Sequence, residues 1–131
     1  MSVGSSPVRF DALSKTHGTA IYPGDRQLDD ALVAKIVFTG QPHARLVSLD
    51  ISAAEAVPGV VTVITAADVP CNEYGLTKFD QPVFISPTDD DSVAVATNVS
   101  RWEADHLAMV VAESLDAANA GAVAILAEWE Q

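Results

Sequence analysis

The sequence predicts a single α+β domain with a mixed β-sheet of about five or six strands and two helices. Two observations lead to this prediction. Short runs of branched apolar residues are separated by turns that contain glycine and proline, and one alanine-rich segment near the carboxyl end has helical character. The chain length of 131 residues suits one hydrophobic core and is short for two domains of ordinary size.

Composition limits the classes of function. Apolar residues make up 49% of the chain and charged residues 19%, which is typical of a packed globular interior. The formal charge of −11 repels phosphate backbones and anionic lipids, so neither nucleic acid nor a membrane is an expected partner. No apolar run approaches the roughly 20 residues that span a bilayer. The single cysteine, Cys71, cannot form an intrachain disulfide, so we expect a cytoplasmic protein.

The first half of the chain contains three expected strands. Residues 1–16 lack periodicity and are expected to form an extended arm, and a short strand at 19–22 should end at Pro23-Gly24. Residues 31–39 are rich in branched side chains, and residues 43–51 alternate between two faces. Because the connection between these two segments is tight, we expect them to pair as antiparallel neighbours.

The second half alternates between helical and extended segments. Ser52 is expected to cap a short helix that Pro58-Gly59 ends, and a strand at 60–65 and one helical turn at 66–70 follow. Residues 71–91 are too long for a simple connector. The final elements are a nearly all-apolar and therefore central strand at 107–113, a helix at 115–124 capped by Ser114, and an alternating strand at 125–130.

The residues that could carry chemistry do not form a recognisable site. His17, His43 and His106 lack the spacing of metal ligands, and Cys71 has no base beside it. The run 89–91 lacks the spaced pattern of a calcium loop. Glu128 and Glu130 should share a strand face that offers no pocket. The residues alone therefore indicate no catalytic, cofactor-binding or metal-binding residue, and they are typical of a scaffold.

Two motifs of the sequence resemble those of a known family. The first follows an Arg-x-Asp-Ala-x-x-Lys-x-x-Gly-x-Ala-x-Tyr pattern, carried by Arg9, Asp11, Ala12, Lys15, Gly18, Ala20 and Tyr22. The second, between residues 39 and 70, is carried by Pro42, His43, Ala44, Arg45, Ser48, Asp50, Ala53, Ala54, Pro58, Gly59, Val60, Thr65, Ala66, Ala67 and Asp68. The segments "DQPVF" and "AMVVAESLDAANAGAVAILAEWE" extend the likeness over nearly the whole chain. The family that these residues resemble is the large subunits of molybdopterin-dependent xanthine dehydrogenases and aldehyde oxidases.

The resemblance implies an α/β hammerhead domain at residues 18–131, preceded by an arm at residues 1–17. It implies a structural role in the scaffold and substrate channel of an enzyme that hydroxylates a purine, an N-heterocycle or an aldehyde carbon. The family's molybdopterin-binding loops and catalytic glutamate are absent from this sequence, so the chain itself should hold no cofactor and should be inactive alone. Molybdopterin with molybdenum, iron–sulfur clusters and possibly FAD would belong to the parent enzyme. The implied partners are the remaining large-subunit domains and the iron–sulfur and flavin subunits.

One residue role follows from the resemblance, and one departure from the family pattern is clear. Leu76 aligns with an apolar position that lines the substrate channel, although it could equally pack on a neighbouring domain. Ala104 stands where relatives carry a glycine, which would be costly if that backbone required a positive φ.

The nature of the chain leaves three readings open. It could be a domain cut from a large subunit, which should expose a large apolar patch and self-associate. A free-standing non-catalytic subunit or interaction module of a split hydroxylase should not expose such a patch. An enzyme active on its own is the third reading.

Overall fold

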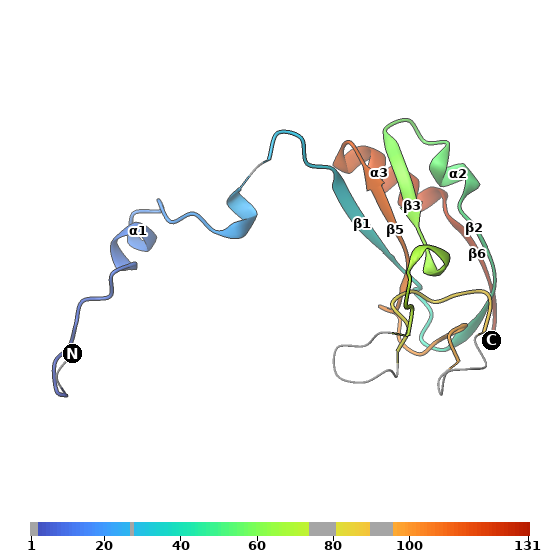
Figure 1. Cartoon of the computed structure of the whole chain (residues 1–131), viewed down its shortest axis with the longest axis horizontal. Helices are drawn as coiled ribbons and strands as arrows, with labels where there is room; N and C mark the ends of the chain where they lie inside the picture. Colours follow the sequence, from blue (N-terminus) through green and yellow to red (C-terminus); the bar gives the residue numbers. More distant parts are fainter. Residues whose placement is uncertain (1–2, 27, 74–80, 90–95) are drawn as a thin grey trace. The chain divides into compact units, whose positions relative to one another are not determined.

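The computed structural model describes residues 3–26, 28–73, 81–89 and 96–131, and it divides into two compact units. The first unit comprises residues 1–31 and the second comprises residues 32–131. Every strand of the described chain and both helices expected from the sequence belong to the second unit (Figure 1).

The first unit contains two short helical turns, α1 at Ala12–Thr16 and the 3₁₀ turn η1 at Pro23–Asp25. Asp11, just before α1, forms ion pairs with Arg9 and Lys15, and these partners lower the pKa of its carboxyl group in that order. The backbone N–H groups of Thr19 and Ala20 both donate to the carbonyl of Ser14. The expected strand at 19–22 is therefore wrong, because this backbone bonds to the end of α1 rather than to another strand.

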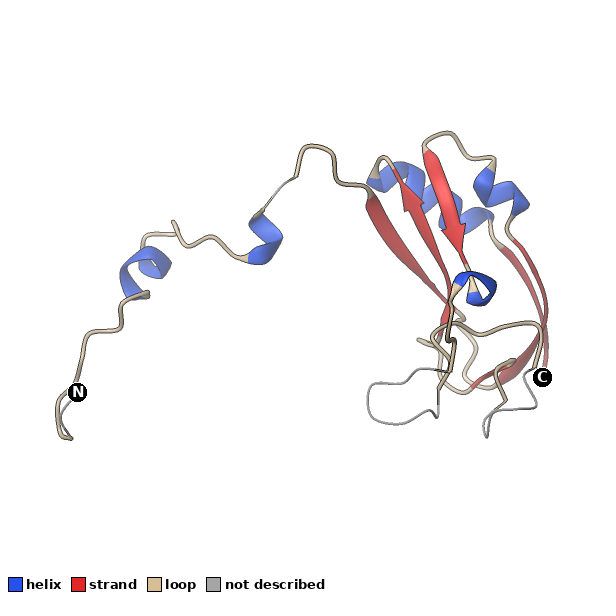
Figure 2. Ribbon diagram, in the orientation of Figure 1, coloured by secondary structure: helices blue, strands red, loops and turns tan. Residues whose placement is uncertain are grey.

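The second unit contains two three-stranded sheets (Figure 2). One has the order β1-β5-β3 and is formed by Val33–Phe38, His106–Ala112 and Val60–Ile64. The other has the order β4-β2-β6 and is formed by Val99–Ser100, Ala44–Asp50 and Leu126–Glu130. The two helices are α2 at Ser52–Glu55 and α3 at Leu115–Ala124, with a 3₁₀ turn η2 at Ala66–Asp68. The α+β class and the central position of the strand after residue 106 are confirmed.

The arrangement of the strands differs from the single mixed sheet that the sequence predicts. The strands lie in two sheets, and each pairing among the described residues is antiparallel. The expected pairing of β1 with β2 is wrong, because β1 pairs with β5 and β2 pairs with β4 and β6. The N–H of Thr39 donates to the backbone carbonyl of Asp105, and the N–H of Gly40 donates to the backbone carbonyl of Glu103. Gly40 has a φ of +64°. The chain that leaves β1 thus stays bonded to the segment before β5 and passes on to the second sheet.

Helix α3 packs closely on the β1-β5-β3 sheet because one of its residues has no side chain. A Cβ atom at Gly121 would lie 2.9 Å from Cγ1 of Val110 and 3.0 Å from Cγ2 of Val60. The buried residues of this core include Ala54, Val63, Ala108 and Val110. A second cluster, made of Leu46, Ile85 and Leu107, joins the two sheets.

The two helices differ in how their first turns are capped. The hydroxyl of Ser114 accepts a hydrogen bond from the N–H of Ala117, so the expected cap of α3 is confirmed. Ser52 is the first residue of α2 rather than its cap, and its N–H donates to the carboxylate of Asp50 at 2.9 Å. Gly59, with a φ of +87°, follows α2 and turns the chain into β3. In the described part of the chain, no helix is long and apolar enough to cross a membrane.

Candidate functional site

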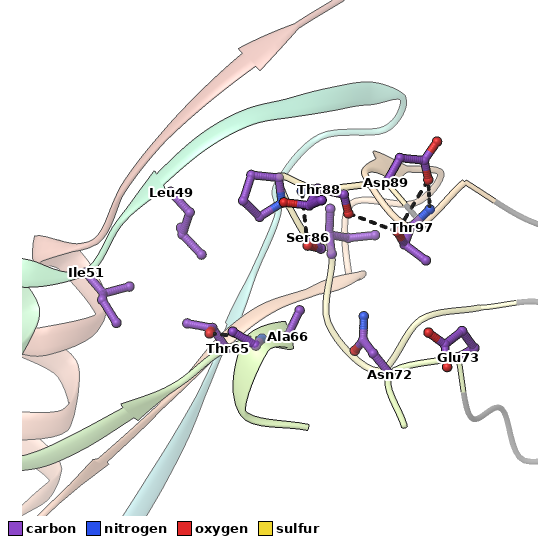
Figure 3. Close-up of a pocket in the computed structure, with 13 residues that line it drawn as sticks. Leu49, Ile51, Thr65, Ala66, Asn72, Glu73, Ser86, Thr88, Asp89 and Thr97 are labelled. Carbon is purple, nitrogen blue, oxygen red and sulfur yellow. Dashed lines mark hydrogen bonds between the residues drawn. The ribbon is translucent and has the colours of Figure 1, made fainter. Parts of the chain in front are cut away.

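A groove in the second unit is lined by residues from several segments of the chain (Figure 3). It has a volume of about 580 Å³. It lies between the end of β2, the start of η2 and three further parts of the chain, residues 72–73, residues 85–89 and Thr97. Its lining residues are Leu49, Ile51, Thr65, Ala66, Ala67, Asn72, Glu73, Ile85, Ser86, Pro87, Thr88, Asp89 and Thr97.

Asn72 fixes one wall of this groove. Its side-chain amide donates to the carbonyl of Phe84 at 2.8 Å, and its side-chain oxygen accepts the N–H of Phe84 at 2.9 Å. The N–H of Val83 also donates to the carbonyl of Asn72 at 2.6 Å. Phe84 and Ile85 are buried, so the amide bonds of Asn72 hold an otherwise irregular segment against the core.

Asp89 fixes the opposite wall. Its carboxylate accepts the N–H of Thr97 at 2.9 Å, and the hydroxyl of Thr97 donates to the carbonyl of Thr88 at 3.1 Å. These bonds join the two points at which residues 90–95 leave and re-enter the described chain. Asp89 thus acts here as a hydrogen-bond acceptor within a turn, whereas Asp90 and Asp91 lie outside the described residues.

The lining of the groove suits an uncharged ligand better than an anion. Leu49, Ile51 and Ile85 supply apolar surface, while hydroxyl, amide and carboxylate groups supply hydrogen-bonding partners. Glu73 and Asp89 are the two charged side chains in the lining, and both are acidic. The thiol of the exposed Cys71 contacts the carboxylate of Glu73 at 3.6 Å.

The three histidines are not brought together with one another. His17 belongs to the first unit, and His43 lies in an exposed turn before β2. The ring of His106 lies between the rings of Phe38 and Phe84, at centroid distances of 5.6 and 6.2 Å. Among the residues that the structure describes, no group of three or more histidine, cysteine or acidic side chains could hold a metal ion.

Glu128 and Glu130 share one exposed face of β6, as the sequence predicts. Each has a partner on the neighbouring strand β2. The hydroxyl of Ser48 donates to Glu128 at 2.9 Å, and Arg45 pairs with Glu130 at 3.6 Å. These contacts connect the two strands, and both members of the Arg45–Glu130 pair are exposed to solvent.

The segment before β5 is held in place by side-chain hydrogen bonds to its backbone. Among the described residues, only glycines have a positive φ, so Ala104 does not carry the expected strain. The carboxylate of Asp105 instead accepts the N–H groups of Arg101 and Trp102, at 2.7 and 3.0 Å. Asn72 and Asp105 were not identified from the sequence. The available signal was their residue type, because Asn and Asp side chains commonly bond nearby backbone in turns.

Leu76, the one substrate-channel residue suggested by the resemblance, lies outside the described residues. The described chain stops at Glu73, in the wall of the groove, and resumes at residue 81.

Comparison with known proteins gives a consistent result. Residues 17–131 match the family model for the a/b hammerhead domain of aldehyde oxidase and xanthine dehydrogenase. The nicotinate dehydrogenase large molybdopterin subunit of Eubacterium barkeri is 34% identical over 130 residues, which are 98% of this chain and 28% of that protein. Xanthine dehydrogenase 1 of Arabidopsis thaliana is 30% identical over 131 residues, which are 99% of this chain and 9% of that protein.

Solved structures agree with these relatives. Quinoline 2-oxidoreductase from Pseudomonas putida 86 superposes with a TM-score of 0.77 at 27% identity, over 98% of this chain and 16% of that chain. Aldehyde oxidoreductase from Desulfovibrio gigas superposes with a TM-score of 0.72 at 26% identity, over 94% of this chain and 14% of that chain. The chain therefore spans between 9% and 28% of each of these proteins.

Proposed function

Because this chain belongs to the aldehyde oxidase and xanthine dehydrogenase a/b hammerhead family, we propose that it is a structural part of a molybdenum hydroxylase large subunit. In this role it contributes to the subunit scaffold and to the wall of the substrate channel. The complete enzyme hydroxylates a purine, another N-heterocycle or an aldehyde carbon.

The observation that supports this proposal is that each match covers nearly all of this chain but only a small part of the related protein. Quinoline 2-oxidoreductase matches 98% of this chain, and yet the match takes up only 16% of that chain. A fold that recurs as one small part of larger enzymes is best explained as one domain of such an enzyme. The domain boundary at 17/18, with an arm at residues 1–17, is supported by a family match that begins at residue 17.

The cofactors belong to other polypeptide in this proposal. The relatives' names include a large molybdopterin subunit and a copper- and molybdenum-containing CO dehydrogenase. Molybdopterin with molybdenum would sit in the remaining large-subunit domains, and iron–sulfur clusters and FAD in partner subunits. With Cys71 as the one cysteine of the chain, the proposal also includes a reducing, cytoplasmic compartment.

The substrate channel runs past the groove in this proposal, with Leu76 as an apolar lining residue. The groove supports this idea through its apolar surface and because none of its described lining residues is basic, which suits an uncharged aromatic ring or aldehyde. In the assembled enzyme, Leu76→Ala should raise KM for a bulky N-heterocycle with less effect on kcat. Val47→Ala, on the exposed face of β2, is the matched control and should leave both parameters unchanged.

A turnover assay tests the proposed function. The 131-residue chain alone should not oxidise aldehydes, purines or N-heterocycles with an electron-accepting dye. The same chain, tagged and purified from its native cells together with its molybdopterin-binding polypeptide, should do so. Turnover by the isolated chain would contradict the proposal, and so would a native complex that lacks any molybdenum-binding polypeptide.

A further inference from the structure

The two faces of the β1-β5-β3 sheet differ in what covers them. Helix α3 covers one face, where Gly121 brings the helix against Val60 and Val110. Val37, Val63 and Ala108 belong to the same core. Because side chains alternate along a strand, the residues between these positions lie on the opposite face.

The strand register defines that opposite face. Met109 in the central strand pairs with Ile36 on one side and Ile64 on the other, so three large apolar side chains form one row across the sheet. Val111 forms a second row in the same way. We call this surface the outer face, and the members that the register places on it are Ala34, Ile36, Phe38, His106, Thr62, Ile64, Met109 and Val111.

The outer face is apolar and accessible in this unit. Apart from the ring of His106, which contacts Phe38, no member has an ionisable side chain, and none is buried. Phe38 is 53% exposed, although it does not lie at a chain end. Figure 2 shows α2 and α3 on the side of this sheet that faces the second sheet, away from the outer face.

The exposed face of the second sheet has the opposite character. It carries charged and polar side chains that pair with one another, including Arg45 with Glu130 and Ser48 with Glu128. The contrast makes the outer face the natural contact surface, because a contiguous exposed apolar patch marks an interaction site.

Charge and chain length decide between the possible occupants. The net charge of −11 repels nucleic acid and anionic lipid, and it weakens the self-association expected of an exposed apolar patch. In quinoline 2-oxidoreductase the matched domain accounts for only 16% of the chain, so most of that polypeptide lies outside the domain.

We propose that the outer face is the surface on which the molybdopterin-binding polypeptide of the large subunit packs, through an apolar segment. This inference rests on the proposed function and adds to it the face and the chemistry of the contact. Uncharged apolar side chains at the partner's surface would cover the Ile36–Met109–Ile64 row.

Site-specific photo-cross-linking in the native cells tests this proposal. The photoreactive residue p-benzoylphenylalanine would replace Phe38 or Met109, in the tagged protein expressed from its own gene. The Phe38 substitution exchanges one exposed aromatic side chain for another. The control places the same residue at Val47, which is 53% exposed on β2 in the other sheet. Circular dichroism of the purified variants checks that each one folds.

The expected result is a cross-link from Phe38 and Met109, and not from Val47, to peptides of the molybdopterin-binding polypeptide, identified by mass spectrometry. That polypeptide counts whether it belongs to the same chain or to a separate subunit. A cross-link from the outer face only to a second copy, or to residues 1–131 of the same chain, would overturn the proposal. So would a cross-link to the molybdopterin-binding polypeptide from Val47 alone, or no cross-link within a purified complex. These last results leave the proposed function intact, whereas a failure to copurify any such polypeptide would overturn the proposed function itself.

Discussion

Asp105 is the residue that closes the turn before β5 without a glycine. Its carboxylate accepts two backbone N–H groups, and the hydroxyl of Ser100 lies 3.5 Å away. Ser100 is fully buried and contacts the hydroxyl of Thr39 at 2.9 Å. The carboxylate of Asp105 thus holds the turn before β5, and through Ser100 this turn is connected to Thr39 at the end of β1.

Replacing Asp105 should destabilise the domain in a graded way. Asp105→Ala should lower the free energy of unfolding by about 1–3 kcal/mol, because two backbone N–H groups lose their acceptor. Asp105→Asn should cost less, because the amide oxygen can still accept. Urea denaturation measures both effects, with Glu103→Ala in the same turn as the control. Equal effects of Asp105→Ala and Glu103→Ala would contradict the role of this carboxylate.

The hydrogen bonds that Asp50 accepts just before α2 give the stability of the domain a defined pH dependence. Hydrogen bonds from the hydroxyl and the N–H of Ser52 lower the pKa of Asp50 below its ordinary value of 3.8. A carboxyl group whose pKa is lowered in the folded state stabilises that state fully above the unfolded pKa, and the contribution disappears as the pH falls through the folded pKa.

The variant Asp50→Ala should therefore have a lower Tm than the wild type at neutral pH, and the difference should shrink as the pH falls below 3.8. Thermal unfolding followed by circular dichroism at several pH values measures this difference. Glu103→Ala serves as the control. A difference that stays constant down to strongly acidic pH would contradict the assignment.

At the scale of the elements, local sequence patterns predict a helix or strand correctly where a single residue or a single apolar run determines it. The cap at Ser114 and the central strand β5 follow from side-chain type and from an uninterrupted apolar run. The start of α2 could not be predicted in this way. Ser52 is a good cap residue by type, but in the structure it is the first helical residue, and Ile51 precedes it without a side-chain cap bond. The pairing of β1 and β2 failed for a different reason, since the turn that joins them bonds to residues 103–105, far away in the sequence.

Gly121 is the element-scale position with the clearest consequence. In most helices, Gly→Ala stabilises by about 1 kcal/mol. Here the new methyl group would lie 2.9 Å from Val110 and 3.0 Å from Val60, both across a packed interface. We expect Gly121→Ala to reduce the free energy of unfolding by about 1–3 kcal/mol in urea denaturation.

The same substitution at Gly24 provides the control, because a Cβ atom there would meet nothing within 4 Å. Gly24→Ala should leave the free energy of unfolding nearly unchanged. A stabilising effect at Gly121 would show that α3 lies farther from the sheet than the structure places it.

At the scale of the whole molecule, the sequence predicts the family and the fold class better than the site. The motifs that resemble the family are spread along the chain, so the family can be recognised even where the predicted pairing of individual strands is wrong. The walls of the groove were not predictable, because the bonds of Asn72 to Phe84 and of Thr97 to Asp89 bring together irregular segments. Such segments have no periodicity from which their contacts could be inferred.

The outer face and the groove give the molecule two different surfaces. One is an apolar sheet face, suited to permanent contact with another polypeptide, and the other is a partly polar hollow, suited to passage of a small uncharged molecule. This combination is what a wall domain of a larger enzyme requires.

Molybdenum content tests the central claim most directly. The 131-residue chain would be purified from a host that makes the molybdopterin cofactor, and its metal would be quantified by inductively coupled plasma mass spectrometry. The account predicts no molybdenum above the buffer blank for the isolated chain. It predicts stoichiometric molybdenum for the complex purified from native cells. Stoichiometric molybdenum bound to the isolated chain would contradict the account.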